Sequence, residues 1–134
     1  MNGYLLDACA LIALLNDESG ADHVDALLKG KIPVYMSAIN ALEVAYDAVR
    51  RTGDPNIATQ PLRLLGQEGV ELFWTLSEPE WVAAARWKAR GRLSLADAIA
   101  LAVAEVRGLR LVSADHHELD PLETAGLVKI EWIR

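Results

Sequence analysis

The sequence predicts an α/β protein: one domain, residues 1–134, with a mostly parallel central sheet of four or five strands and helices on both faces. Short apolar runs alternate with helical patterns along the whole chain, and strands separated by helices imply parallel pairing under a helical cover. A length of 134 residues, of which 52% are hydrophobic, suits a single core of ordinary size.

Each strand is predicted from a short apolar run, and each helix from a helical repeat of apolar residues that ends near glycine. Strands are expected at residues 4–6, 33–36, 70–74, 110–112 and 128–133. Helices are expected at residues 8–15, 21–28, 41–51, 57–65, 79–90 and 95–106, with a short one after Asp115. Gly53, Pro55 and Pro61 interrupt the pattern between residues 52 and 69, so the boundaries there are least defined.

Composition restricts the compartment and the partners. The single cysteine, Cys9, cannot form an intrachain disulfide, which is typical of a reducing cytosol. The N-terminus lacks the basic segment of a signal peptide, and the longest apolar stretches are too short to cross a bilayer. We therefore expect a cytoplasmic protein without a membrane partner.

The net charge of −6 argues against binding nucleic acid through overall charge. One stretch differs, because no acid occurs between Trp81 and Ala96. Its basic residues are Arg86, Lys88, Arg90 and Arg92. They are either a solvated helix end or an RNA-binding segment, and the sequence leaves both interpretations open.

Four acidic residues lie where predicted strands end or predicted helices begin. They are Asp7, Glu43, Asp97 and Asp115. Asp7 and Asp115 each follow an apolar strand, whereas Glu43 and Asp97 are expected to open helices. Ligand sites in open α/β sheets form at the carboxyl ends of strands, so we expect the four carboxylates to converge. Two carboxylates about 4 Å apart repel by roughly 4 kcal/mol at an effective dielectric near 20, so such a cluster requires a bound cation.

Each acid also has a purely structural explanation. Ser94 and Asp97 fit a capping box, Asp7 and Asp115 can cap helices, and Glu43 can be a surface acid. The helix after Asp97 is so apolar, however, that we expect it to be buried, and a charge in its first turn then needs a partner beyond the backbone. Taken together, the acids favour a site.

Several neighbours of these acids are candidates for supporting roles. The hydroxyl of Ser113 can orient a carboxylate or a metal-bound water. His116 and His117 are adjacent in sequence, so at most one of them can face a site beside Asp115. Asp47 lies one turn after Glu43 and is expected to be solvated.

Carboxylate oxygens without His or Cys partners favour a hard cation, Mg²⁺ or Mn²⁺, which keeps several waters when bound. Such a centre can position a phosphodiester and activate a water for in-line attack. The acids alone would repel RNA or DNA, so the metal must invert the local charge.

Four segments together resemble the PIN-domain nucleases, and within them the VapC-type ribonuclease toxins of type II toxin-antitoxin systems. "LLDACALIALL" is similar to the family's opening strand and first acid, and "SAINALEVAY" to the Ser/Thr-led helix that carries its glutamate. "LSLADAIALAVAE" resembles the segment of the third acid and "LRLVSADHHEL" that of the fourth. Two positions depart from the pattern: Cys9 replaces a more familiar Ser or Thr, and the segment from His116 to Leu119 lacks an aromatic residue.

The resemblance implies that Asp7, Glu43, Asp97 and Asp115 are catalytic and metal-binding acids. It also implies a Mg²⁺ or Mn²⁺ cofactor, an RNA substrate, and an antitoxin whose C-terminal segment presents a basic side chain to the carboxylates. The high hydrophobic content further suggests a homodimer, with the helices of "ACALIALL" and "HVDALL" as candidate surfaces.

Other classes remain as alternatives. The chain can be a stand-alone RNA-processing PIN nuclease, or a non-enzymatic binding module whose acids are only helix caps. A haloacid-dehalogenase-like phosphatase would need an Asp at position 9, where Cys9 stands. A receiver-type phosphoacceptor would need paired acids near the first strand and a late lysine at a strand end, and Lys129 is poorly placed for that.

Overall fold

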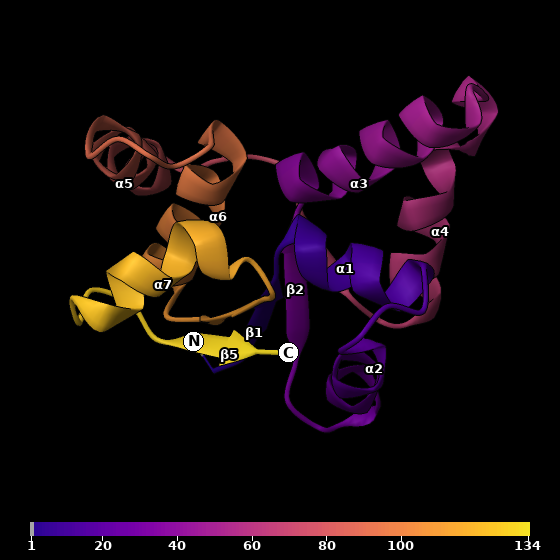
Figure 1. Ribbon diagram of the computed structural model, residues 1–134, viewed down its shortest axis with the longest axis horizontal. Helices are drawn as coiled ribbons and strands as arrows, with labels where there is room; N and C mark the ends of the chain where they lie inside the picture. The colour runs from indigo at the N-terminus through magenta and orange to yellow at the C-terminus, as the bar shows by residue number, and fades with distance from the viewer. Residues whose placement is uncertain (1) are drawn as a thin grey trace.

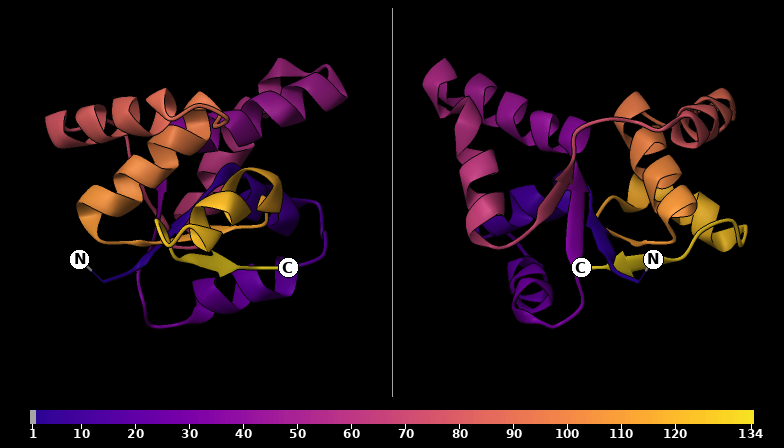
Figure 2. Two further views of the ribbon diagram at one scale, coloured as in Figure 1. Left: turned by 60° about the vertical axis from the view of Figure 1, so that its left-hand side comes forward. Right: turned by 180° about the vertical axis from the view of Figure 1, so that it is seen from behind.

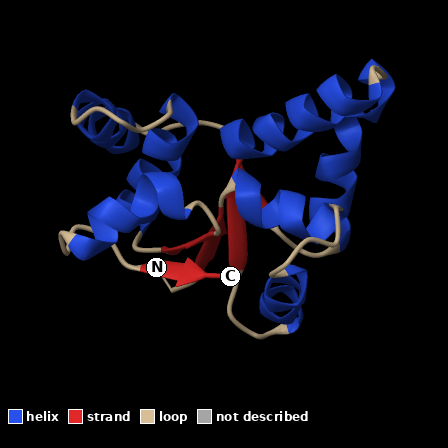
Figure 3. Cartoon of the chain, in the orientation of Figure 1, coloured by secondary structure: helices blue, strands red, loops and turns tan. Residues whose placement is uncertain are grey.

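Within residues 2–134, which the computed structural model describes, five parallel strands form one sheet in the order β3-β2-β1-β4-β5 (Figures 1 and 3). The strands are β1 (Tyr4–Leu6), β2 (Val34–Ser37), β3 (Glu71–Phe73), β4 (Arg110–Ser113) and β5 (Ile130–Trp132). Leu5, at the centre of the sheet, pairs with Tyr35 on one side and Leu111 on the other. The predicted parallel sheet is therefore confirmed.

The helices follow the predicted order. They are α1 (Ala8–Leu15), α2 (Ala21–Lys29), α3 (Ala38–Thr52), α4 (Gln60–Gln67), α5 (Glu78–Ala89), α6 (Leu95–Arg107) and α7 (His116–Thr124). A 3₁₀ helix, η1 (Pro55–Thr59), precedes α4, so the helix expected at residues 57–65 is divided into two elements. No helix in the described part of the chain is both long enough and apolar enough to cross a membrane.

Helix α3 begins at Ala38, earlier than the predicted start at residue 41. Ser37, the last residue of β2, caps it by accepting a hydrogen bond from the Ile39 amide at 3.3 Å. The expectation that Glu43 opens a helix is therefore wrong, because Glu43 lies in the second turn of α3. The early start went undetected because the polar Asn40 breaks the apolar pattern ahead of residue 41.

Helices cover both faces of the sheet, as predicted, because successive residues of a strand point to opposite faces. Leu5 packs with buried residues of α5, α6 and α7, whereas Leu6 packs with those of α1, α2 and α3. The view from behind in Figure 2 shows α6 and α7 on one side of the strands and α1 and α4 on the other. Each fully buried leucine stabilises the fold by about 1.5–3 kcal/mol.

The carboxyl ends of β1, β2 and β4 lie together because these strands are parallel neighbours. Helices α1 and α3 begin at this end of the sheet (Figure 1). The strand order changes direction at β1: β2 and β3 lie on one side of it, and β4 and β5 lie on the other. In open α/β sheets this position forms the crevice that binds ligands.

An ion pair joins α5 to α6. Ser77 and Glu80 form a capping box at the start of α5. The fully buried carboxylate of Glu80 also accepts hydrogen bonds from Arg107, at the end of α6, at 2.8 and 3.3 Å. The Arg107 guanidinium lies 3.7 Å from the centre of the Phe73 ring. These contacts fix α6 against α5.

Candidate metal centre

Asp7 is the most buried acid of the site, with 1% of its surface exposed. It directly follows β1 and caps α1, because its Oδ1 accepts a hydrogen bond from the Ala10 amide at 2.9 Å. Its other oxygen, Oδ2, is buried without a donor among the described residues. Helix capping therefore explains one oxygen of Asp7 and leaves the other unexplained.

The environment of Asp7 opposes its ionisation. Burial raises the pKa of Asp7 from 3.8 to about 7, and the nearby charges of Asp115 and Glu43 raise it further, while the Ser113 hydroxyl and the Ala10 amide act in the opposite direction. The hydrogen bonds that the protein offers therefore do not offset the burial of the ionised Asp7 carboxylate. A bound cation would supply the missing partner.

Glu43 enters the site from α3 together with a residue that sequence reasoning missed. Asn40 precedes it by one turn, is fully buried, and donates from Nδ2 to the Ala96 carbonyl at 3.2 Å, which joins α3 to α6. Its Oδ1 is buried without a donor in the described chain. Burial raises the pKa of Glu43, as do Glu118 and Asp115, whereas Asn40 lowers it. The sequence did contain a signal for Asn40: it lies three residues before a candidate acid, so both side chains share one face of the helix.

The closest acidic group is formed by Asp97, Asp115 and Glu118. One carboxylate oxygen from each of them lies within 4.8 Å of the others. Asp97 is in the first turn of α6, where its amide donates to the capping Ser94 hydroxyl at 3.1 Å. Asp115 caps α7 and accepts from the Glu118 amide at 3.2 Å. Glu118 was not predicted. The sequence signal for it was its position three residues after Asp115.

The carboxyl groups of Asp97 and Glu118 lie close together and affect each other's ionisation. Burial and this contact raise the pKa of Asp97, while the same contact lowers the pKa of Glu118. A proton held by one carboxyl of the pair would reduce the repulsion between them. A divalent cation would replace this proton.

No ion pair among residues 2–134 involves any of the five clustered acids. These acids are Asp7, Glu43, Asp97, Asp115 and Glu118. Their oxygens are hard ligands, and a buried oxygen of Asp7 lacks a donor. Both features fit Mg²⁺ or Mn²⁺, which prefer oxygen ligands and keep bound waters.

The other candidate neighbours divide into two groups. Ser113 is fully buried, accepts from the Asp115 amide at 3.0 Å and lies beside Asp7, so it belongs to the site. Cys9 is near the acids as well, and burial together with their charges raises the pKa of its thiol to about 12. Asp47 instead pairs with Arg50 and Arg51, away from the other acids.

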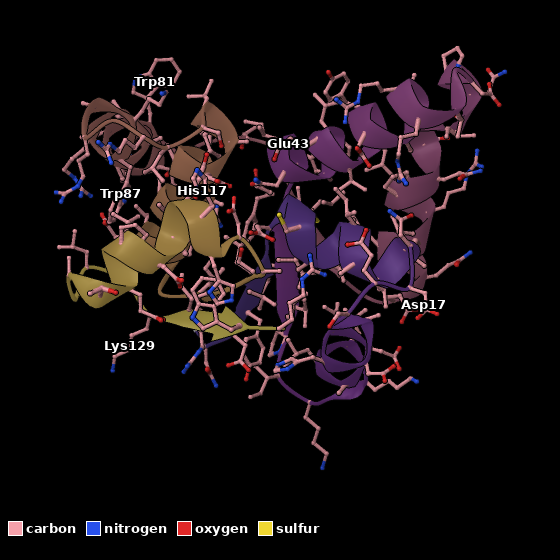
Figure 4. All side chains as sticks on the ribbon, in the orientation of Figure 1. Asp17, Glu43, Trp81, Trp87, His117 and Lys129 are labelled. Atoms are coloured by element: carbon pink, nitrogen blue, oxygen red, sulfur yellow. The ribbon has the colours of Figure 1, made fainter. Side chains whose placement is uncertain are left out.

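The two adjacent histidines point in different directions, as expected. His116 stacks on Trp132, with 3.8 Å between ring centres, and its nitrogens contact Asp120 and the Arg134 carbonyl. His116 therefore holds Trp132 and Arg134 against α7. His117 is exposed on α7, and its charge lowers the pKa of Glu118. Figure 4 shows His117 on α7 and Glu43 on α3.

The basic stretch is exposed but not uniform. The guanidinium of Arg86 pairs with Glu105, and Arg86 and Arg90 both lie over the buried Trp87 ring, at 5.4 and 5.8 Å. The charge of Lys88 lowers the pKa of Glu118, so Lys88 faces that acid. Arg92 is exposed in the turn before α6.

The candidate dimer surfaces on α1 and α2 stay a prediction, although these helices expose little apolar area. Half of the residues of α1 are buried, and Val24 of α2 is fully buried as well. Apart from Leu15 at the end of α1, the large exposed apolar side chains of the described residues lie elsewhere. Trp81 and Leu95, for instance, are 69% and 61% exposed beside a hollow between α5 and α6.

Several solved structures have the same fold. VapC20 from Mycobacterium tuberculosis, a toxin that cleaves the sarcin-ricin loop, is 21% identical with a TM-score of 0.72, over 96% of this chain and 98% of that one. DNA-bound VapBC from Salmonella typhimurium is 17% identical with a TM-score of 0.70, over 100% of both chains. PAE2754 from Pyrobaculum aerophilum is 25% identical with a TM-score of 0.64, over 98% of this chain and 89% of that one.

Among curated proteins, no sequence matches this chain. The sequence model of the PIN domain, by contrast, matches residues 4–120. This range contains all five clustered acids and the strands that carry Asp7 and Ser113. The chain therefore belongs to the PIN domain family.

Proposed function

We propose that this protein is a Mg²⁺- or Mn²⁺-dependent endoribonuclease and the toxin of a type II toxin-antitoxin system. The observation that carries the proposal is the unbalanced charge of the site. Three carboxylates lie within 4.8 Å of one another beside the buried, donorless oxygen of Asp7, and no basic side chain of the described chain pairs with them. Residues of this kind bind a hard cation.

The side chains have distinct tasks in this proposal. Asp7, Asp97 and Asp115 would hold the cation, and Glu43 would orient water at its edge. Ser113 keeps Asp115 in place through its bond to the Asp115 amide. When bound, the cation offsets the charge of a phosphodiester and lowers the pKa of a water for in-line attack. The buried start of α1 shields the base of the site from bulk water.

Capping alone does not account for the arrangement. Asp7 and Asp115 do cap α1 and α7, and the Asp97 amide is bonded by Ser94. The free oxygen of Asp7 has no part in a cap, however, and neither has Glu43 in the second turn of α3. A binding module that used its acids only as caps would need neither group in this position.

The RNA substrate and the antitoxin are supported by the structural neighbours. VapC20 is a toxin that cleaves the sarcin-ricin loop, and VapBC from Salmonella typhimurium has the same fold over the full chain. Basic side chains near the acids, Lys88 above all, would guide the RNA backbone. We further propose a homodimer and an antitoxin segment that presents a basic side chain to the carboxylates.

The test is cleavage of RNA by the purified chain with Mg²⁺ or Mn²⁺, with excess EDTA, and after Asp97→Asn. Cleavage should need the metal and disappear in the variant, while Asp120→Asn, at an exposed acid of α7, should keep it. The products should carry 5′-phosphate and 3′-hydroxyl ends, because the nucleophile is water. Cyclic 2′,3′-phosphate ends, or full activity in EDTA, would contradict the metal-dependent mechanism.

The same assay tests the partner. Co-expression with the product of the neighbouring gene should yield a complex with suppressed cleavage. An active chain that binds no neighbouring product would instead be a stand-alone RNA-processing nuclease.

A further inference from the structure

A small cavity lies near the amino ends of β4 and β5, whereas the clustered acids lie at the carboxyl ends of the strands. Its volume is about 170 Å³. Apolar side chains from α6, from β4 and from the segment that leads into β5 make most of its wall. Among them are Leu101, Leu109, Leu111, Leu127 and Ile130. None of the described residues that line the cavity is one of the five clustered acids, so it is separate from the candidate metal centre.

Trp87, in the last turn of α5, forms part of this wall and carries an unused hydrogen-bond donor. Its side chain is 4% exposed, and Nε1 is buried without an acceptor among residues 2–134. Trp132 differs, because its Nε1 donates to Glu123 at 2.9 Å. A buried indole N–H normally has an acceptor. A molecule in the cavity would supply one.

The two charged residues that line the cavity are both exposed and differ in their partners. Glu105 forms an ion pair with Arg86. Lys129 lies just before β5, and none of the ion pairs within residues 2–134 includes it. Figure 4 shows Trp87 and Lys129 on the side of the molecule that carries α5, α6 and α7. The available charge at the cavity is therefore positive, which favours an anion.

The volume of the cavity suits one aromatic ring, because an apolar cavity of about 150 Å³ binds benzene. We propose that the cavity binds a small aromatic carboxylate that carries a second oxygen on its ring. The ring packs on the apolar wall, the carboxylate pairs with Lys129, and the ring oxygen accepts from Trp87 Nε1. Apolar walls with a few polar groups are typical of small-molecule sites. The inference does not depend on the proposed nuclease.

The competing explanation is a packing gap that admits any small apolar molecule. Three related probes separate the two explanations. The probe 4-hydroxyphenylacetate has the carboxylate, the ring and the ring oxygen. Its amide, 4-hydroxyphenylacetamide, lacks the charge, and phenylacetate lacks the ring oxygen. Each comparison therefore removes one of the proposed contacts.

The experiment is a titration of the full chain with each probe, followed by calorimetry and by the indole N–H signals in ¹⁵N–¹H NMR spectra. The chain has four tryptophans, and Trp87→Phe identifies the Trp87 signal by its loss. Added 4-hydroxyphenylacetate should shift this signal until it saturates and should leave the signal of the exposed Trp74 in place. The amide should bind about threefold more weakly, as for an exposed ion pair, and phenylacetate about fivefold more weakly.

Variants test each contact. Lys129→Met should remove the preference for the acid over the amide, whereas Lys31→Met, at an exposed lysine ahead of β2, should keep it. Trp87→Phe should bind 4-hydroxyphenylacetate and phenylacetate equally, because the indole donor is gone. Ala104→Leu adds three carbon atoms to the wall and should abolish binding.

The absence of a saturable shift of the Trp87 signal at millimolar 4-hydroxyphenylacetate would overturn the proposal. Equal binding of the acid and the amide would do the same, and so would an unchanged preference in Lys129→Met. If Trp87→Phe does not fold, Ala104→Leu and Lys129→Met decide. Wild-type affinity in Ala104→Leu would show that the probe binds elsewhere.

Discussion

Asp7 is the best residue for testing whether a buried charge destabilises the fold. It directly follows the central strand, caps a helix and lies near the other acids. Replacing it with Asn keeps the size and the capping oxygen, since Asn and Asp are about equal as caps. Only the charge is removed. In the metal-free protein, Asp7→Asn should therefore increase stability, although under the proposed function it should abolish RNA cleavage.

The size of the effect follows from the pKa of Asp7, which is 3.8 in the unfolded chain and about 7 in the folded one. Between these values the folded form binds a proton that the unfolded form lacks. Stability due to this proton is fully present below pH 3.8 and is lost as the pH rises through about 7. At 1.36 kcal/mol per pH unit, the loss amounts to about 4 kcal/mol.

Asp7→Asn should not lose stability in this way, because an Asn side chain does not ionise. Its advantage over the wild type should be about 4 kcal/mol at pH 8, about 2 kcal/mol or less at pH 5, and near zero below pH 4. Urea unfolding in EDTA measures it. For a slope of about 2 kcal/mol per M, the midpoint at pH 8 should rise by about 2 M. Added Mg²⁺ should stabilise the wild type and leave the variant nearly unchanged.

The control is Asp54→Asn, the same change at a cap where the acid is exposed and accepts from the Asn56 amide at 3.0 Å. It should alter stability little at either pH. Equal stability of Asp7→Asn and the wild type at pH 8 in EDTA would refute the idea of a costly buried charge. An equal gain at pH 5 and pH 8 would point to a cause other than ionisation.

Two further predictions concern surfaces. Replacing all four basic residues of the last turn of α5 and the turn before α6 by Ala should weaken RNA binding and flatten its salt dependence, because the slope on a single strand falls by about 0.7 for each phosphate that is no longer neutralised. The residues are Arg86, Lys88, Arg90 and Arg92. The control is Arg50, whose side chain pairs with Asp47, and Arg50→Ala should leave the slope unchanged. An unaltered slope in the fourfold variant would mean that the basic stretch is only a solvated helix end. For the homodimer, Trp81→Glu should yield a monomer by light scattering, because Trp81 is 69% exposed beside an apolar hollow. A wild-type monomer at micromolar concentration would refute the dimer.

Much of the architecture was decided by local sequence. Strand β1 and helix α1 have the predicted bounds, because an apolar run, an acid that caps and a second apolar run follow one another without interruption. Both faces of the sheet are covered because residues such as Leu5 and Leu6 are apolar at successive positions. Local patterns were weaker where proline and polar residues interrupt them, as in the division between η1 and α4.

The acids are a different matter, because periodicity places a residue on an element and says nothing of which distant residue it will meet. Local strand and cap signals were enough to place Asp7, Asp97 and Asp115 after strands or at helix starts. The approach of Glu118 to Asp97, and the bond by which Asn40 ties α3 to α6, could not be found in this way. These contacts depend on how α3, α6 and α7 pack at one end of the sheet, and that packing is set by the whole core.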